Sequence, residues 1–166
     1  PSEAIGFPLR TVIECIDLAM LPPRTRALDI GCGVGRSSFE MARCCTEVVG
    51  IDTSTVFIMA AEKLRTKGRV RYSKKVVGSV SERLLATVSG DIDRNRVRFQ
   101  VCDAHEIPRS LGKFEVVHAA NLLCRMTDPI KLLERLPSLL ASGGQLVLTT
   151  PLTWLEDYTL SLIHIC

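Results

Sequence analysis

The protein has 166 residues, of which 46% are hydrophobic and 23% are charged, and its formal net charge is +3 at pH 7. This length and composition are typical of one globular domain with a sizeable core, spanning residues 1–166. The small basic excess does not favour a nucleic-acid partner. No apolar run approaches the roughly 18 residues that a membrane-spanning helix needs, so we expect no membrane partner either.

The cysteine and histidine content argues against disulfide and metal chemistry. The cysteine count is odd, no CxxC pair is present, and most of these residues lie in apolar runs, where free cysteine packs like a small core residue. The three histidines, His105, His118 and His164, show no spacing typical of zinc ligands. We therefore expect reduced thiols, a cytoplasmic protein and no metal site.

The first and last readable helices are marked by apolar spacing and by proline and glycine. Apolar residues from Leu9 to Met20 recur at helical spacing, and Pro22-Pro23 ends that pattern. Asp128-Pro129 is expected to begin another helix, which Pro137 kinks and Gly143-Gly144 ends. Its buried stripe is predicted to comprise Leu132, Leu133, Leu136 and Leu140.

Short apolar segments between the helical patterns predict a parallel sheet. Strands are expected at "RALDI", "EVVGID", "RVRFQV", "FEVVHAA" and "QLVLTT". Because strands and helices alternate, right-handed crossovers should place helices on both faces of a Rossmann-like, open, mostly parallel α/β sheet. The polar segment 67–95 breaks this alternation, and we interpret it as an insertion with local structure near the mouth of a site.

A glycine cluster follows the first predicted strand. Residues 31–35 read Gly-Cys-Gly-Val-Gly, and Arg36 stands where the G-x-G-x-x-G dinucleotide pattern requires its third glycine. This mismatch argues against a nicotinamide oxidoreductase. A pyrophosphate favours a helix N-terminus, whereas S-adenosylmethionine has no phosphate and carries a sulfonium, an amino group and a carboxylate. We predict that Gly31, Cys32, Gly33 and Gly35 approach S-adenosylmethionine closely, because glycine leaves room at the backbone.

Acidic residues at the ends of three predicted strands complete the predicted cofactor site. Asp29 precedes the glycines and is expected near the cationic amino-acid end of the cofactor. Asp52 lies 21 positions after Gly31 (52 − 31), the spacing at which a carboxylate accepts ribose hydroxyls, and Thr53 beside it is included in the site. Asp103 and Ala104 follow the next strand, where adenine would be bound.

Residues further along the chain are candidates with two interpretations each. Asn121 either hydrogen-bonds the cofactor or acceptor or caps a helix, and Arg125 either pairs with an acceptor carboxylate or is an ordinary surface arginine. Trp154 and Asp157 either form an aromatic, acidic wall for a small acceptor or, for Trp154, close the edge of the core. His105 and His118 are predicted to be structural, and no catalytic residue is identified.

Three stretches carry a resemblance to a known family. "LDIGCGVGRSSFEMA" (28–42) resembles the class I S-adenosylmethionine-dependent methyltransferases, a likeness that extends over nearly the whole chain. With "FEVVHAANLLCRMTDP" (114–129) and "TTPLTWLEDYT" (149–159), it is more closely similar to the methyltransferase domain of the ovothiol-forming 5-histidylcysteine sulfoxide synthases and to free-standing 4-mercaptohistidine N1-methyltransferases. The resemblance implies methylation of an imidazole nitrogen of a thiol-bearing histidine in ovothiol biosynthesis. It also implies fusion to, or cooperation with, an iron-dependent sulfoxide synthase domain.

The end of the sequence and the choice of acceptor leave further expectations. Methyltransferases of this class continue with two more strands, so we expect a C-terminally truncated domain in which residues 160–166 form a non-native tail. Alternative functions are a methyltransferase for another acceptor, such as a quinone, a lipid or RNA, and a cofactor-binding module without activity of its own.

Overall fold

The computed structural model describes residues 2–77, 80–151, 153 and 158. Its helices are α1 (Ser2–Cys15), α2 (Arg36–Met41), α3 (Thr55–Lys67) and α4 (Pro129–Leu139). Its strands are β1 (Arg26–Ile30), β2 (Glu47–Asp52), β3 (Arg69–Val77), β4 (Val80–Thr87), β5 (Val97–Val101), β6 (Phe114–Ala120) and β7 (Leu140–Thr149). Short 3-10 helices span Leu18–Met20, Arg94–Arg96, Ala104–Glu106, Arg109–Leu111 and Leu123–Arg125.

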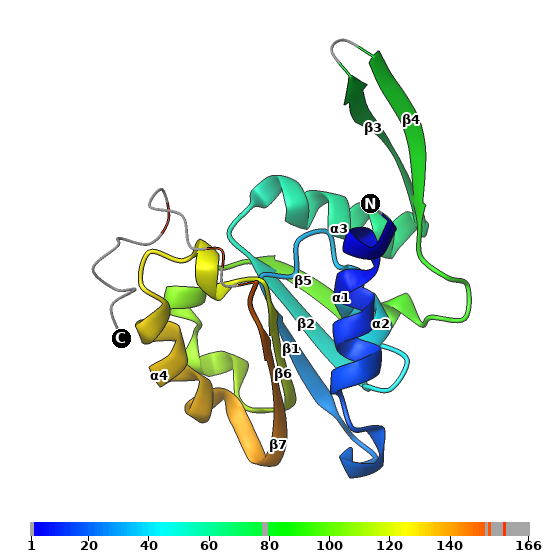
Figure 1. The fold of residues 1–166 in the computed structure, drawn as a ribbon. Coiled ribbons are helices and arrows are strands. Elements are labelled where there is room, and N and C mark those ends of the chain that lie inside the picture. Colours follow the sequence, from blue (N-terminus) through cyan, green and yellow to red (C-terminus); the bar gives the residue numbers. More distant parts are fainter. Residues whose placement is uncertain (1, 78–79, 152, 154–157, 159–166) are drawn as a thin grey trace.

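A parallel sheet of five described strands forms the centre of the molecule, in the order β5-β2-β1-β6-β7 (Figure 1). The chain first adds strands on one side of β1 and then crosses to the other side with β6. This reversal places a crevice at the carboxyl ends of β1 and β6, where ligands bind in open α/β sheets. The Rossmann-like α/β fold predicted from the sequence is confirmed.

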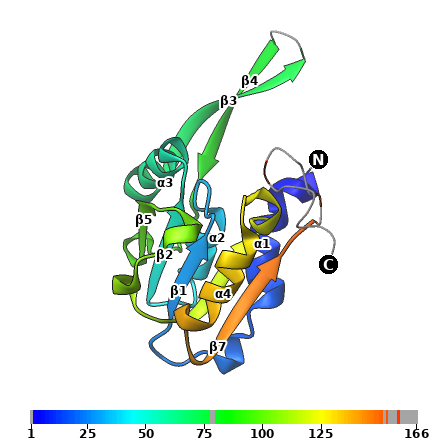
Figure 2. The same cartoon turned by 90° about the vertical axis from the view of Figure 1, so that its left-hand side faces the viewer.

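Two apolar cores cover the two faces of the sheet. On one face, Val12 of α1, Phe39 of α2 and Leu64 of α3 pack with β-strand residues such as Ala27 and Val116. On the other face, Leu132, Leu136 and Leu139 of α4 and the segment 104–111 pack against alternate residues of the same strands. Figures 1 and 2 show these layers, with α1, α2 and α3 on one side and α4 on the other. The continuous apolar strands follow from burial on both faces.

The segment between α3 and β5 forms an antiparallel hairpin of β3 and β4, which projects away from the sheet at the end where the strands of the sheet finish (Figures 1 and 2). Its foot is closed, because the Val88 N–H donates to the Gly68 carbonyl at 2.9 Å. Arg94 donates to the carbonyls of Leu64 and Arg65 at the end of α3, at 3.3 and 2.6 Å. The inserted strands therefore leave and rejoin the domain at one point.

The opening helix is shorter than the apolar spacing predicts. α1 ends at Cys15, and Asp17 instead caps the 3-10 helix by accepting the Ala19 N–H at 3.0 Å. An aspartate that binds its own following backbone competes with helix continuation. Ile13 and Met20, which were predicted on the buried helical face, are exposed.

The last helix also ends earlier than predicted. α4 ends at Leu139, two residues after Pro137, rather than at Gly143-Gly144. Proline within the last turn removes a helical N–H, and Leu140 pairs with Phe114 as the first residue of β7. Gly143 lies inside β7 with a φ of +73°, and Leu133 is exposed instead of buried.

Candidate functional site

The glycine loop between β1 and α2 is bonded to the neighbouring strand β2. The N–H groups of Gly31 and Cys32 both donate to the Ile51 carbonyl, at 2.8 and 3.0 Å. Gly31, Gly33 and Gly35 have φ values of +73°, +55° and +88°, in the left-handed region that glycine adopts without steric cost. The sequence therefore builds a tight loop whose backbone lies open at the carboxyl end of the sheet.

Asp52, the last residue of β2, is hydrogen-bonded to the backbone of this loop. Its Oδ2 accepts the Gly33 N–H at 2.9 Å, and its Oδ1 accepts the Ser54 N–H at 2.8 Å. Ser54 caps α3 by accepting the Phe57 N–H, and Thr53 is exposed. A carboxylate has about four acceptor positions, so Asp52 keeps capacity for ligand hydroxyls.

Asp29 is buried beneath the loop, with 1% of its surface exposed. Its carboxylate accepts hydrogen bonds from the hydroxyls of Ser37 and Ser38, at 2.6 and 2.5 Å, and contacts His118 Nδ1 at 2.8 Å. Burial alone raises the pKa of this carboxyl, but the charge of His118 and the three hydrogen bonds outweigh it and hold the pKa below its ordinary value. Asp29 is therefore a charged group that is already bonded within the protein.

A cavity of about 190 Å³ lies between α1, the glycine loop and the end of β6. Its lining comprises Phe7, Pro8, Asp29, Gly31, Cys32, Gly33, Val34, Arg36, Ser37, His118, Ala120 and Asn121. The structure thus brings together five of the predicted cofactor residues, Asp29, Gly31, Cys32, Gly33 and Asn121. The Cys32 thiol stays neutral here, because burial and the charges of Asp29 and Asp52 raise its pKa.

Asn121 follows β6 with a φ of +57°, which asparagine tolerates better than most residues. Its N–H donates to the Thr149 carbonyl at 2.8 Å, which fixes the backbone beside the cavity. The following 3-10 helix is preceded by Leu122 and has no side-chain cap. The helix-cap interpretation of Asn121 is therefore wrong, and its exposed side chain lines the cavity instead.

Asp103 and Ala104 lie at the end of β5, outside the cavity lining. Asp103 caps the 3-10 helix that follows, accepting the His105 N–H at 2.8 Å and contacting His105 Nδ1 at 2.7 Å. The bond from the His105 backbone is the main cause of a lowered Asp103 pKa. Ala104 packs into the core with 8% exposure. Asp103 remains half exposed, so its carboxylate is accessible from solvent.

Of the residues predicted to bind the acceptor, the structure describes one. The Arg125 guanidinium stacks over the Tyr158 ring, 5.1 Å from its centroid. Arg125 is exposed, as an ordinary surface arginine would be. Trp154, Asp157 and the tail 160–166 lie outside the described residues.

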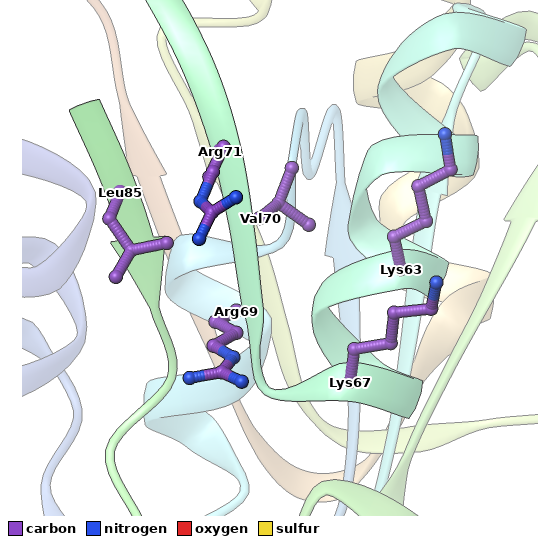
Figure 3. A pocket seen from close by; sticks show the side chains of 6 residues that line it. All are labelled: Lys63, Lys67, Arg69, Val70, Arg71 and Leu85. Carbon is purple, nitrogen blue, oxygen red and sulfur yellow. The ribbon is translucent and has the colours of Figure 1, made fainter. Parts of the chain in front are cut away.

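A second, larger hollow of about 750 Å³ lies at the foot of the β3–β4 hairpin (Figure 3). It is lined by Lys63, Lys67, Arg69, Val70, Arg71 and Leu85. Figure 3 shows the two lysines extending from α3 on one side of β3, with Arg69 and Arg71 on the other side. The four cations do not converge on one point, and none of the predicted cofactor residues lines this hollow.

The described part of the chain offers no group of three or more His, Cys, Asp or Glu side chains that could hold a metal ion. None of its helices is long and apolar enough to cross a membrane. Its six cysteines are free: Cys15, Cys32, Cys44, Cys45, Cys102 and Cys124.

Several residues of the site were not found from the sequence. Ser37 and Ser38 bond Asp29, and Thr11 lies 2.9 Å from His118 Nε2. His118, predicted to be structural, is buried with 1% exposure and also lies in the lining of the cavity. A histidine within an otherwise apolar strand was the one available signal, because a buried imidazole needs polar partners.

Comparisons with known proteins agree with this geometry. A family model described as a methyltransferase domain matches residues 9–164. Among curated relatives, phosphoethanolamine N-methyltransferase 3 of Arabidopsis thaliana is 26% identical over 142 residues, covering 85% of this chain and 24% of the relative. A ubiquinone biosynthesis O-methyltransferase of Xanthomonas axonopodis is 27% identical over 139 residues, covering 83% and 48%. The chain thus spans less than half the length of either relative.

Among solved structures, a TehB-like SAM-dependent methyltransferase from Corynebacterium glutamicum has the same fold. Its TM-score is 0.53 at 20% identity, and the match covers 87% of this chain and 70% of that one. The sequence-based prediction of an S-adenosylmethionine-dependent methyltransferase fold is confirmed at this level. The chain belongs to the methyltransferase domain family.

Proposed function

We propose that this chain binds S-adenosylmethionine at the glycine loop and transfers its methyl group to a small molecule, an imidazole nitrogen of a thiol-bearing histidine. The observation that carries the cofactor assignment is the hydrogen bond from the Gly33 N–H to the Asp52 carboxylate. This hydrogen bond places the backbone of Gly33, which carries no side chain, beside the Asp52 carboxylate at the point where the strand order of the sheet reverses.

The residues present fit S-adenosylmethionine in two parts. The cavity would hold the amino-acid end of the cofactor, and the residues at the ends of the neighbouring strands would hold its nucleoside. A β-carbon built on Gly33 would meet no atom within 4 Å, so open space faces the loop there. The cavity of about 190 Å³ is smaller than the pockets of roughly 300–1,000 Å³ that bury whole ligands. Gly31, Cys32, Gly33 and Asn121 would hold the amino-acid end, while Asp52 and Thr53, with Asp103 and Ala104, would hold the nucleoside.

When bound, S-adenosylmethionine would supply a methyl group to an acceptor lone pair, which attacks the methyl carbon in line with the breaking carbon–sulfur bond and releases S-adenosylhomocysteine. The chain's own contribution is alignment and exclusion of water, for which α1 supplies Phe7 and Pro8 beside the loop. A neutral imidazole nitrogen is already nucleophilic, so this acceptor requires no strong general base. Such an acceptor suits this cavity, because the buried acid Asp29 already takes part in three hydrogen bonds within the protein.

The thiohistidine acceptor is supported by the resemblance of segments 114–129 and 149–159 to the ovothiol-forming family. The first of these segments contributes Asn121 to the cavity and Arg125 beside Tyr158. An arginine held by an aromatic ring suits an amino-acid carboxylate, because guanidinium groups bind carboxylates in a bidentate manner. We propose that Arg125, with Trp154 and Asp157, binds this acceptor, and that an iron-dependent sulfoxide synthase domain supplies its precursor.

Calorimetric titration with S-adenosylmethionine, S-adenosylhomocysteine and NAD tests the cofactor. We expect binding of the first two and no binding of NAD. Mass spectrometry after incubation with 5-thiohistidine tests the acceptor, with histidine, a catechol and a short RNA as parallel acceptors. Methylation of the catechol or RNA in place of thiohistidine would contradict the acceptor, while cofactor binding without methylation of any acceptor would favour a binding module.

A further inference from the structure

The positive charge of this chain is concentrated in the segment that runs from the second half of α3 through the β3–β4 hairpin. Residues 63–87 hold eight of the 21 Lys and Arg residues but only one of the 18 Asp and Glu residues, Glu82. The positive excess of this segment is therefore larger than the +3 of the whole chain, and the rest of the chain has more acidic than basic residues. The hairpin is a cationic projection on an otherwise acidic domain.

The register of the hairpin gathers its arginines on one face. Successive side chains of a strand point to opposite faces, so Arg69 and Arg71 of β3 share a face. Arg71 pairs with Leu85, and two residues further along β3, Ser73 pairs with Arg83. Leu85 and Arg83 therefore lie on that same face. We call the three arginines and Leu85, all of them exposed, the arginine face.

The opposite face of the hairpin holds it to the domain. Val70 and its cross-strand neighbour Ala86 pack against the core that contains Leu64. Glu82, the one acidic residue of the hairpin, lies on this opposite face, where it pairs with Lys74. Figure 3 shows Arg69 and Arg71 on the side of β3 that is turned away from α3. The arginine face therefore points away from the core and carries no acid of its own.

The charges of the arginine face are not compensated within the described part of the chain. None of its three guanidinium groups forms an ion pair or a hydrogen bond with another described residue. On the central sheet, by contrast, Arg26 and Arg98 both bind the Glu47 carboxylate. Like charges held together in this way repel one another, so an anionic partner would be bound with relief of that repulsion.

We propose that the arginine face is a docking surface for an anionic lipid membrane. Residues two apart on a strand are separated by roughly 7 Å, so Arg69 and Arg71 would contact separate negative headgroups and not one anion. The hairpin projects away from the sheet, which lets this face reach an extended surface (Figures 1 and 2). A peripheral contact of this kind requires no apolar run long enough to span a membrane.

Apolar side chains among the cations favour a membrane over a nucleic acid. Leu85 lies beside Arg71 in the register, and 53% of its surface is exposed. In the hollow of about 750 Å³ at the foot of the hairpin, Val70 and Leu85 line the same space as four cations. Aliphatic side chains gain free energy at the boundary between lipid headgroups and acyl chains, whereas a phosphate backbone offers them no apolar contact.

Co-sedimentation of the full chain with lipid vesicles tests the contact. One set of vesicles contains equal parts of phosphatidylglycerol and phosphatidylcholine, and the other contains phosphatidylcholine alone. We expect the protein to bind the first set and not the second, and to bind less at high salt, which screens the charges. Failure to bind the anionic vesicles would overturn the proposal. The assay contains no S-adenosylmethionine, so its outcome is independent of the proposed function.

A triple variant, Arg69→Gln, Arg71→Gln and Arg83→Gln, tests the residues. Each cation near an anionic surface changes partitioning by roughly fivefold, so we expect the triple variant to bind on the order of 100-fold more weakly. The control variant removes the same charge at exposed positions that precede β1 and β6: Arg24→Gln, Arg109→Gln and Lys113→Gln. It should bind as the wild type does, and both variants should keep the wild-type melting temperature. Equal losses in the two variants would show an effect of net charge alone and would contradict a docking surface.

Titration with a fluorescent single-stranded RNA separates the membrane from a nucleic acid. We expect RNA to bind more weakly than the anionic vesicles and not to displace the protein from them. If RNA binds through the three arginines and displaces the protein from the vesicles, the arginine face is a nucleic-acid site and the membrane proposal is wrong.

Discussion

The carboxylate of Asp52 accepts the backbone N–H of Gly33 at 2.9 Å, so the end of β2 directly supports the loop that follows β1. These residues are 19 positions apart and meet because β1 and β2 are parallel neighbours. One side chain therefore shapes the loop and remains available to a ligand.

Replacement of Asp52 should weaken cofactor binding more than it weakens the fold. We expect Asp52→Ala to cost about 1–3 kcal/mol of binding free energy for S-adenosylmethionine, since charge-assisted hydrogen bonds are lost. Asp52→Asn keeps one acceptor oxygen and should lose less. Calorimetric titration measures both, with Asp93→Ala, a cap remote from the site, as the control. Wild-type affinity in Asp52→Ala would remove this residue from the site.

Two glycines of the loop should respond differently to alanine. A β-carbon at Gly33 meets no atom within 4 Å, whereas one at Gly35 would lie 2.5 Å from Phe99 and 3.1 Å from Phe39. Both variants carry the left-handed strain of about 1–2 kcal/mol, and Gly35→Ala adds overpacking of about 1–3 kcal/mol. We expect Gly35→Ala to melt at the lower temperature, and Gly33→Ala to lose cofactor affinity while staying folded. Equal melting temperatures would contradict this placement.

The buried Asp29 carboxylate should make stability depend on acidity. Its pKa in the folded chain is below the ordinary value of 3.8, so its stabilising contribution is complete above that value and is lost as pH falls through the folded pKa. We expect Asp29→Asn to lower the free energy of unfolding by about 1–3 kcal/mol near pH 7, because the amide gives up charge-assisted hydrogen bonds to Ser37, Ser38 and His118. Urea denaturation should show this difference shrinking below about pH 4. A difference that grows on acidification would show the opposite shift.

Asn121 has a positive φ and an exposed side-chain amide. Substitution by glycine removes the amide and keeps the backbone conformation, so it separates the two contributions. Asn121→Gly preserves the φ of +57° without strain, whereas Asn121→Ala adds about 1–2 kcal/mol of it. We expect Asn121→Gly to keep the wild-type melting temperature and to reduce cofactor or acceptor affinity, measured by titration. If both variants bind normally and only Asn121→Ala is destabilised, the residue serves the backbone alone.

The sheet and the glycine loop were predictable because their signals are local. Apolar runs, the G-x-G-x-G spacing and Asp52 at a strand end each lie within a short window of sequence. The role of Asp29 was not predictable from the sequence, because its partner His118 is 89 residues away and becomes a neighbour only when β1 pairs with β6. The early end of α4 was missed for a similar reason, since Leu140 leaves the helical pattern to pair with Phe114.

The two ends of the β3–β4 hairpin lie next to each other, so the outer part of the hairpin is an exchangeable segment. Gly68 and Val88 are hydrogen-bonded to each other, and Val70 and Ala86 at the base of the hairpin pack against the core that contains Leu64, so the exchangeable stretch lies beyond Val70 and Ala86. Arg94, which bonds the last carbonyls of α3, lies outside the exchangeable stretch. The part of the hairpin beyond Val70 and Ala86 can therefore be shortened, exchanged or fitted with a reporter group without redesign of the central sheet.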